Sequence, residues 1–327
     1  MKDMQSRREF LGRAAAVSAG VALGAPIPGV ARPAAKLKTT DPKRALVTWF
    51  SQAGHTERIG KIIACRLIRA GLAVDHGDIR DVSLDGIAGY DLVVAGSPVY
   101  YFEAPDFLTA RLESLPSIEG TAVASYATYG GPGHNQHNTA CDLLERLVDR
   151  GGVPVGIDTF GNMSTFAPTW SSGRIARVVK YRDRPNEATY RRARQFTDGL
   201  LASARAGKPI EVKRSITAFE AMKVLNSRWW TKRMIGRHDI DAGTCISCGL
   251  CEERCPAGAI TIARHRVDRD RCVACMGCVN LCPVQAHVMI FNGDRVYGFQ
   301  ELLRRQGIEI IEPEELRGGF CPAGGRR

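Results

Sequence analysis

The sequence predicts two domains of different class. One is an α/β domain with a doubly wound, five-stranded parallel sheet over residues 45–205, and the other is a small α+β domain over residues 241–295. In the first region apolar runs of strand length alternate with amphipathic helical segments. In the second region eight of the eleven cysteines form two regularly spaced runs. The composition, 44% hydrophobic and 24% charged, is that of a folded protein.

The first predicted strand leads directly into a polar loop and a helix. Residues 45–50 are an apolar run typical of a buried strand, and residues 57–70 have helical amphipathicity. This arrangement binds phosphate, because N–H groups at a helix start point toward an anion and glycine permits close approach. An ordinary capped turn is the alternative. The loop between the two elements is Ser51-Gln52-Ala53-Gly54-His55-Thr56.

Four further strands complete the predicted sheet, at residues 72–79, 90–96, 121–127 and 153–159, with a helix at 138–150. Ligands of such sheets bind at the carboxyl ends of the strands. Two more polar loops lie at those ends and are expected to join the first one in a single site. They are Ser97-Pro98-Val99-Tyr100-Tyr101 and Thr128-Tyr129-Gly130-Gly131.

This pattern resembles the flavodoxin-like domains that bind FMN. The resemblance implies that residues 51–56 hold the FMN phosphate and that the other two loops enclose the isoalloxazine. Tyr100 is the predicted stacking ring, with Tyr101 and Tyr129 as alternatives. The family commonly has a hydroxyl residue at the position of Ala53 and an asparagine at that of His55. One phosphate hydrogen bond is therefore expected to be missing.

Residues 160–194 interrupt the expected last helix of this domain, and we interpret them as an insertion near the flavin site. Their second half, residues 174–194, is strongly basic, which is typical of a solvated face, with an acidic partner as the alternative. His134 and His137 follow the third loop. They are expected to be exposed loop residues; proton donation to a substrate or to reduced flavin is the alternative.

The cysteine runs have the spacing C-x-x-C-x-x-C-x-x-x-C-P, and the second follows the first after 27 residues. In this bacterial arrangement the fourth cysteine of each run ligates the other cluster. One predicted 4Fe-4S cluster thus takes Cys245, Cys248, Cys251 and Cys282, and the other takes Cys272, Cys275, Cys278 and Cys255. The region resembles bacterial two-cluster ferredoxins.

Structural zinc is the competing interpretation of these cysteines, because C-x-x-C pairs also bind zinc. Zinc sites use two pairs of ligands, whereas each run here supplies three closely spaced cysteines and a fourth before proline. Two 4Fe-4S clusters are therefore preferred. Of the remaining cysteines, Cys65 and Cys141 are expected in the core, and the role of Cys321 stays open.

The amino terminus resembles the twin-arginine export signal of bacteria. Ser6-Arg7-Arg8-Glu9-Phe10-Leu11 precede an Ala- and Gly-rich stretch that is too short for a membrane span of roughly 20 residues. Small residues near Ala31 offer a cleavage site, which implies a periplasmic mature protein without a transmembrane span. The rest divides into a linker at 32–44, a basic linker at 206–240 with Trp229-Trp230, and a C-terminal helix and tail at 296–327.

Together the two domains resemble flavodoxin–ferredoxin fusion proteins of the "EFR" type. FMN accepts two electrons and passes them singly, and each cluster carries one, so an electron-transfer protein is expected. A flavin-dependent reductase of a small molecule, fed by the clusters, is the alternative. The sequence lacks a nicotinamide fingerprint after a strand and any recognised nucleic-acid fold. With a net charge of +11, an acidic or membrane-associated redox partner is expected.

Overall fold

A computed structural model describes residues 36–133, 135–215 and 227–322. The predicted export signal, the start of the first linker, His134 and part of the basic linker lie outside these ranges. From Lys36 onward the chain forms one compact unit. Within the described ranges, no helix is long and apolar enough to cross a membrane.

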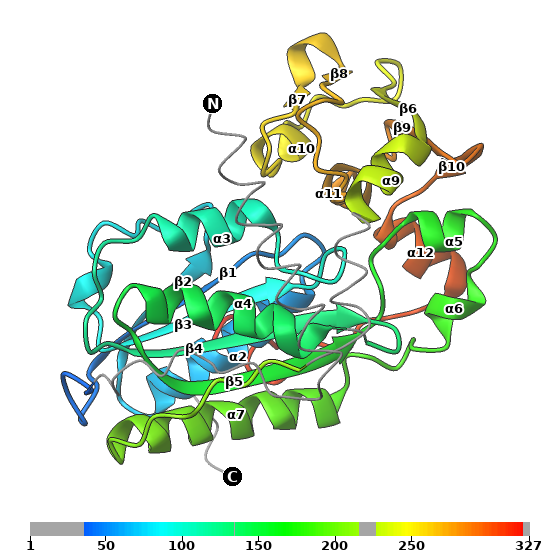
Figure 1. Cartoon of the computed structure of the whole chain (residues 1–327). Helices are drawn as coiled ribbons and strands as arrows, with labels where there is room; N and C mark the ends of the chain where they lie inside the picture. Colours follow the sequence, from blue (N-terminus) through cyan, green and yellow to red (C-terminus); the bar gives the residue numbers. More distant parts are fainter. Residues whose placement is uncertain (1–35, 134, 216–226, 323–327) are drawn as a thin grey trace, which may run out of the picture. The chain divides into compact units, whose positions relative to one another are not determined.

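The predicted five-stranded sheet is confirmed, and all its strands are parallel (Figure 1). Its order, β2-β1-β3-β4-β5, is that of the flavodoxin-like class of doubly wound folds. Strands β3 and β4 run further than expected, so Ser97, Pro98, Thr128, Tyr129 and Gly130 belong to strands and not to loops. The strands are β1 (Arg44–Trp49), β2 (Ala73–Asp78), β3 (Leu92–Pro98), β4 (Ala122–Gly130) and β5 (Val153–Asn162).

Helices cover both faces of the sheet (Figure 1). Helices α2 (His55–Arg69) and α7 (Glu187–Arg205) enclose one apolar core, and α3 (Asp106–Glu113) and α4 (Gln136–Asp149) enclose the other, together with the short 3₁₀-helix η1 (Ile87–Gly89). Sequence analysis did not predict α3. This helix has eight residues and buries only Leu108 and Leu112, so its apolar periodicity is weak.

The insertion expected at residues 160–194 is shorter than predicted, because residues 160–162 belong to β5 and residues 187–194 to α7. Residues 163–186 lie between these elements and contain two one-turn helices, α5 (Pro168–Ser171) and α6 (Ala176–Val179). Several apolar side chains of the insertion are buried. Trp170, only 2% exposed, shares a core with Met276 and Phe299 of the C-terminal part of the chain. The insertion is therefore a packing platform for the second domain as well as a basic segment.

The second domain is α+β, as predicted. Strand β6 belongs to its antiparallel sheet although it falls in the segment that we expected to be a linker. Its elements are α9 (Ser227–Met234), β6 (Ile235–Ile240), α10 (Leu250–Glu253), β7 (Ile260–Thr261), η2 (Ile262–Arg264), β8 (Arg266–Val267), α11 (Gly277–Leu281), β9 (His287–Phe291) and β10 (Asp294–Val296).

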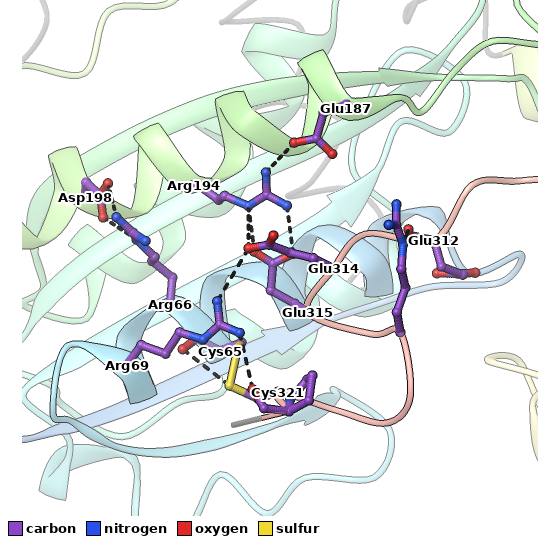
Figure 2. A network of polar contacts seen from close by, with 12 residues as sticks. Cys65, Arg66, Arg69, Glu187, Arg194, Asp198, Glu312, Glu314, Glu315 and Cys321 are labelled. Atoms are coloured by element: carbon purple, nitrogen blue, oxygen red, sulfur yellow. Dashed lines mark hydrogen bonds and ion pairs between the residues drawn. A yellow bond between two sulfur atoms is a disulfide. The ribbon is translucent and has the colours of Figure 1, made fainter. Parts of the chain in front are cut away.

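After helix α12 (Phe299–Gln306), residues 307–322 return to the first domain, and we call them the C-terminal segment. Cys321 forms a disulfide with Cys65 of α2, with a Cα–Cα distance of 5.2 Å (Figure 2). Cys65 is buried, as predicted. Sequence analysis did not predict its partner, because 256 residues separate the two cysteines.

Candidate functional site

The three predicted loops line one cavity of about 370 Å³ at the carboxyl ends of the sheet strands. This volume is within the range of small-molecule sites. Of the residues predicted for flavin binding, only Gly54, Ser97 and Gly131 are not part of its lining. The predicted residues that line it are Ser51, Gln52, Ala53, His55, Thr56, Pro98, Val99, Tyr100, Tyr101, Thr128, Tyr129 and Gly130.

Sequence analysis did not assign the rest of the lining to this site. Phe102 directly follows the second predicted loop and Asn162 ends β5, whereas the other residues belong to the insertion, α9 and the second cysteine run, and only packing brings them to the cavity. The missed lining residues are Phe102, Asn162, Ser164, Thr165, Phe166, Thr231, Ala274 and Cys275.

The phosphate loop is held in a defined shape by its neighbours. Gly54, the N-cap of α2, has a φ of 84°, which glycine adopts without strain. Asp78 accepts a hydrogen bond from the backbone N–H of Ser51 at 3.0 Å, and the Thr56 and Thr128 hydroxyls lie 2.8 Å apart. The start of α2 is thus fixed at the cavity, where its first N–H groups have no partners within the helix.

Several buried polar atoms of this loop have no hydrogen-bond partner among the described residues. They are Ser51 Oγ and both ring nitrogens of His55. Each buried unpaired polar group costs about 1–3 kcal/mol. Burial, together with the nearby Arg58 charge, lowers the pKa of His55 to about 3. Such a set of unused donors at a helix start fits the phosphate of FMN.

All three tyrosines that we considered as the stacking ring line the cavity. Their positions do not distinguish among them, and the choice of Tyr100 stays a prediction. Its hydroxyl donates to Gln52 Oε1, and its ring meets that of Phe50 edge to face. The Tyr101 hydroxyl donates to the Ala274 carbonyl at 2.8 Å. Both side chains are therefore anchored at their hydroxyl ends.

His137 is not part of the cavity lining. Its Nε2 lies 2.7 Å from the carbonyl oxygen of Lys213, and it is hydrogen-bonded there. The proton-donating role that we considered for it in a reductase therefore has no support in its position.

The eight motif cysteines gather in two groups. A hollow in the second domain is lined by Cys245, Cys248, Cys251 and Cys282. Another is lined by Cys255, Cys272, Cys275 and Cys278, and Cys251 lines both. The fourth cysteine of each run thus lies with the first three of the other run. This exchange is the predicted ligand arrangement of a two-cluster domain.

The two cysteine groups share one backbone geometry, repeated after 27 residues. Ser247 and Ala274 have φ values of 53° and 54°, and each backbone N–H donates at 3.4 Å to the sulfur of the cysteine two residues before it. Ala259 and Ala286 donate in the same way to Cys255 and Cys282, at 3.3 and 3.2 Å. Each run therefore presents its sulfurs with preformed N–H donors.

The cysteine thiols need a compensating cation to ionise. Burial raises the pKa of Cys251 to about 11 and that of Cys275 to about 12, and it raises the pKa of Cys278 well above the usual range. Buried thiolates are stable next to metal ions, which supply positive charge. The residues present therefore fit iron–sulfur clusters.

Two buried histidines adjoin the second group. The ligand atoms of His238, Cys278 and His287 lie within 4.8 Å of one another, which is a possible metal-binding set. Cys278 also belongs to the four-cysteine group, and His238 Nε2 is 3.4 Å from its sulfur. A cluster-bound thiolate only accepts hydrogen bonds, so His238 is better explained as a donor to a cluster ligand than as a zinc ligand.

The cavity at the sheet edge and the second cysteine group are neighbours. Cys275 and Ala274 belong to the cavity lining. A Cβ atom on Gly277 would come within 2.6 Å of Gln52 Nε2, so glycine permits the phosphate loop and the cysteine motif to approach this closely. The second cysteine run thus forms part of the cavity wall.

A flavodoxin-like sheet joined to a dicluster cysteine arrangement defines a fusion protein of the electron-transfer class. The family model described as "4Fe-4S dicluster domain" matches residues 237–293, which indicates 4Fe-4S cluster binding. No curated protein sequence matches the chain.

Solved structures similar to the chain include several flavodoxins. The flavodoxin of Streptococcus pneumonia TIGR4 is 19% identical, with 49% of this chain and 99% of that chain covered and a TM-score of 0.39. Flavodoxin 1 from Bacillus cereus is 14% identical, with 49% and 98% covered and a TM-score of 0.39. Rubredoxin oxygen:oxidoreductase from Desulfovibrio gigas is 14% identical, with 53% and 38% covered and a TM-score of 0.39. The fold assignment rests on the strand order.

Proposed function

We propose that this protein is an exported electron carrier that exchanges electrons between FMN and two 4Fe-4S clusters within one chain. FMN would lie in the cavity at the sheet edge, and one cluster would lie in each cysteine group. When bound, FMN supplies two-electron chemistry and the clusters supply single-electron steps. The chain's own residues hold these groups, exclude water from them and set their spacing.

One observation carries this proposal: Cys275, a predicted cluster ligand, lines the cavity predicted to hold FMN. The cluster held by Cys272, Cys275, Cys278 and Cys255 is therefore the one next to the flavin. The described residues that line the other cysteine group, with Cys248, and those that pack around it all belong to the second domain. The order along the electron path is then FMN, the cluster with Cys275, and the cluster with Cys248.

The distal cysteine group is the proposed point of exchange with a partner protein. Cys248 is exposed, and the neighbouring Ile246 is 61% exposed. The overall positive charge favours approach of an acidic or membrane-associated redox protein. We propose that this partner exchanges electrons with the cluster at Cys248.

Two features support an extracytoplasmic location. The amino terminus resembles a twin-arginine signal, and that pathway exports proteins that are already folded around their cofactors. The Cys65–Cys321 disulfide is typical of oxidising compartments such as the bacterial periplasm. We therefore propose that the protein works in the periplasm.

Cofactor analysis of the anaerobically purified full-length chain tests the proposal. We expect about eight irons and one FMN per chain, and a reductive titration that shows both chromophores. Cys272→Ser should reduce the iron content to about four, whereas Cys141→Ser should leave it unchanged. Four irons in the unaltered protein would contradict two clusters. Absence of flavin would leave only a ferredoxin.

A further inference from the structure

Gln52 belongs to the predicted phosphate loop, but its side chain packs against the second cysteine run. It is 6% exposed and lines the cavity at the sheet edge together with Cys275. A Cβ atom on Gly277 would lie 2.6 Å from Gln52 Nε2 and 3.1 Å from Gln52 Cδ. The amide end of this side chain is therefore in contact with the loop that carries the cysteines.

The orientation of the Gln52 amide is set by Tyr100. The Tyr100 hydroxyl donates a hydrogen bond to Gln52 Oε1, and the Tyr100 ring packs edge to face on Phe50. A glutamine amide has an acceptor oxygen on one side and a donor NH2 group on the other. With the oxygen engaged by Tyr100, the NH2 group is left to face the second cysteine run.

The sulfur of Cys275 is the acceptor that this NH2 group meets. Gln52 Nε2 is buried and has no nitrogen or oxygen partner among the described residues. Burial raises the pKa of the Cys275 thiol to about 12, and hydrogen bonds from the Gly277 backbone and the Gln52 side chain oppose this rise. A cluster-bound thiolate only accepts hydrogen bonds, so it requires the N–H side of the amide, which is the side that Tyr100 leaves free.

We propose that Gln52 is a hydrogen-bond donor to Cys275 in the cluster next to the predicted flavin cavity, and that Tyr100 is the positioning residue of Gln52. This inference rests on the proposed function. Hydrogen bonds to cluster sulfurs stabilise the more negative reduced form and thus raise the reduction potential. A residue of the phosphate loop therefore tunes the cluster with which the flavin exchanges electrons.

The test is a spectroelectrochemical titration, monitored by EPR, of flavin-depleted, cluster-containing full-length protein, so that FMN itself makes no contribution. Gln52→Leu should lower the ratio of reduced to oxidised cluster about fivefold at a fixed electrode potential near the midpoint. Gln52→Glu keeps the acceptor for Tyr100 but has no N–H, and it should lower the ratio at least as much. Tyr100→Phe keeps the ring and should cause a smaller decrease. The other cluster should not respond to any of these changes.

Gln300→Leu is the matched control, because it removes an exposed amide from α12 and Gln300 lines neither cysteine group. It should leave both potentials unchanged. Unchanged potentials in Gln52→Leu and Gln52→Glu, at full iron content, overturn the Gln52 assignment. If both variants lose iron, an unchanged potential in Tyr100→Phe overturns it instead. Either result leaves the proposed function intact, whereas absence of two clusters from the unaltered protein contradicts both proposals.

Discussion

At the residue scale, the two cysteine groups have matching backbone donors but different side-chain neighbours. Each group has the same N–H to sulfur hydrogen bonds. In the group next to the predicted flavin cavity, His238 Nε2 lies 3.4 Å from Cys278 Sγ, whereas His287, which lines the other group, has no hydrogen bond to a sulfur among the described residues. Hydrogen bonds to sulfur raise the reduction potential of a cluster, because they stabilise its more negative reduced form. The two clusters are therefore expected to differ in potential.

His238→Leu should lower the potential of the cluster next to the flavin. Loss of one hydrogen bond of about 1 kcal/mol corresponds to roughly 40 mV for a one-electron couple. A spectroelectrochemical titration monitored by EPR measures both clusters. His238→Gln, which keeps an N–H donor, should retain part of the potential.

His265→Asn serves as the control in the same domain. His265 has a φ of 48°, which asparagine tolerates, and it does not line either cysteine group. It should leave both potentials unchanged. If the cluster at Cys278 has the same reduction potential in the unaltered protein and in His238→Leu, the assigned hydrogen bond is contradicted.

At the scale of elements, helix α2 connects the predicted flavin site with the C-terminal segment. The predicted phosphate loop ends in its first turn, and Arg58, Cys65 and Arg69 along the helix contact the C-terminal segment. The disulfide closes a loop across 256 residues. Crosslinks of long loops stabilise a fold mainly by restricting its unfolded chain.

Cys321→Ser should lower the free energy of unfolding by about 2–4 kcal/mol under non-reducing conditions. Urea unfolding followed by circular dichroism, with and without a reductant, measures this effect. Reductant should destabilise the unaltered protein and Cys141→Ser, because both retain the crosslink. Reductant should not destabilise Cys321→Ser. If it lowers the free energy of unfolding of this variant as much as that of the unaltered protein, the disulfide is not the cause of the reductant effect.

At the scale of the whole molecule, the position of the second domain depends on the insertion after β5. Trp170 packs in the core shared with α12, and its Nε1 donates to the Tyr297 carbonyl at 2.9 Å. Asn280 donates to the Thr165 carbonyl at 2.9 Å. These contacts, together with the hydrogen bond of Tyr101 to Ala274, hold the second cysteine run at the predicted flavin cavity.

Trp170→Ala should slow electron exchange between the flavin and the clusters while iron and FMN contents stay unchanged. Truncation of a buried Trp removes about 3–5 kcal/mol of packing, which loosens the contact between the domains. Anaerobic stopped-flow spectroscopy measures this rate: the clusters are reduced first, and the later reduction of the flavin is recorded. Trp170→Phe should have a smaller effect.

The exposed Trp230 offers a comparison within the same chain. It is 57% exposed, so Trp230→Ala removes an aromatic ring without opening a core. Its rate of flavin reduction should equal that of the unaltered protein. The packing argument fails if Trp170→Ala, with full cofactor content, also transfers electrons at the unaltered rate.

The sequence by itself determined the features that depend on residues close together in the chain. Periodicity and loop chemistry predicted the five strands of the sheet and most of the cavity lining, because parallel strands bring their carboxyl ends to one edge. The C-x-x-C-x-x-C-x-x-x-C-P spacing predicted both cysteine groups, including the exchange of Cys255 and Cys282. Each of these features depends on residues that are neighbours in the chain or on a motif that recurs with the same spacing.

Only the tertiary structure decided which distant residues meet. The Arg58–Glu312 pair spans 254 residues, and the Cys65–Cys321 disulfide spans 256. Neither has a local signal, because a lone arginine or cysteine in a helix fits many partners. Cys275 reaches the flavin cavity for the same kind of reason: the apolar face of the insertion, and not any motif, sets where the second domain packs.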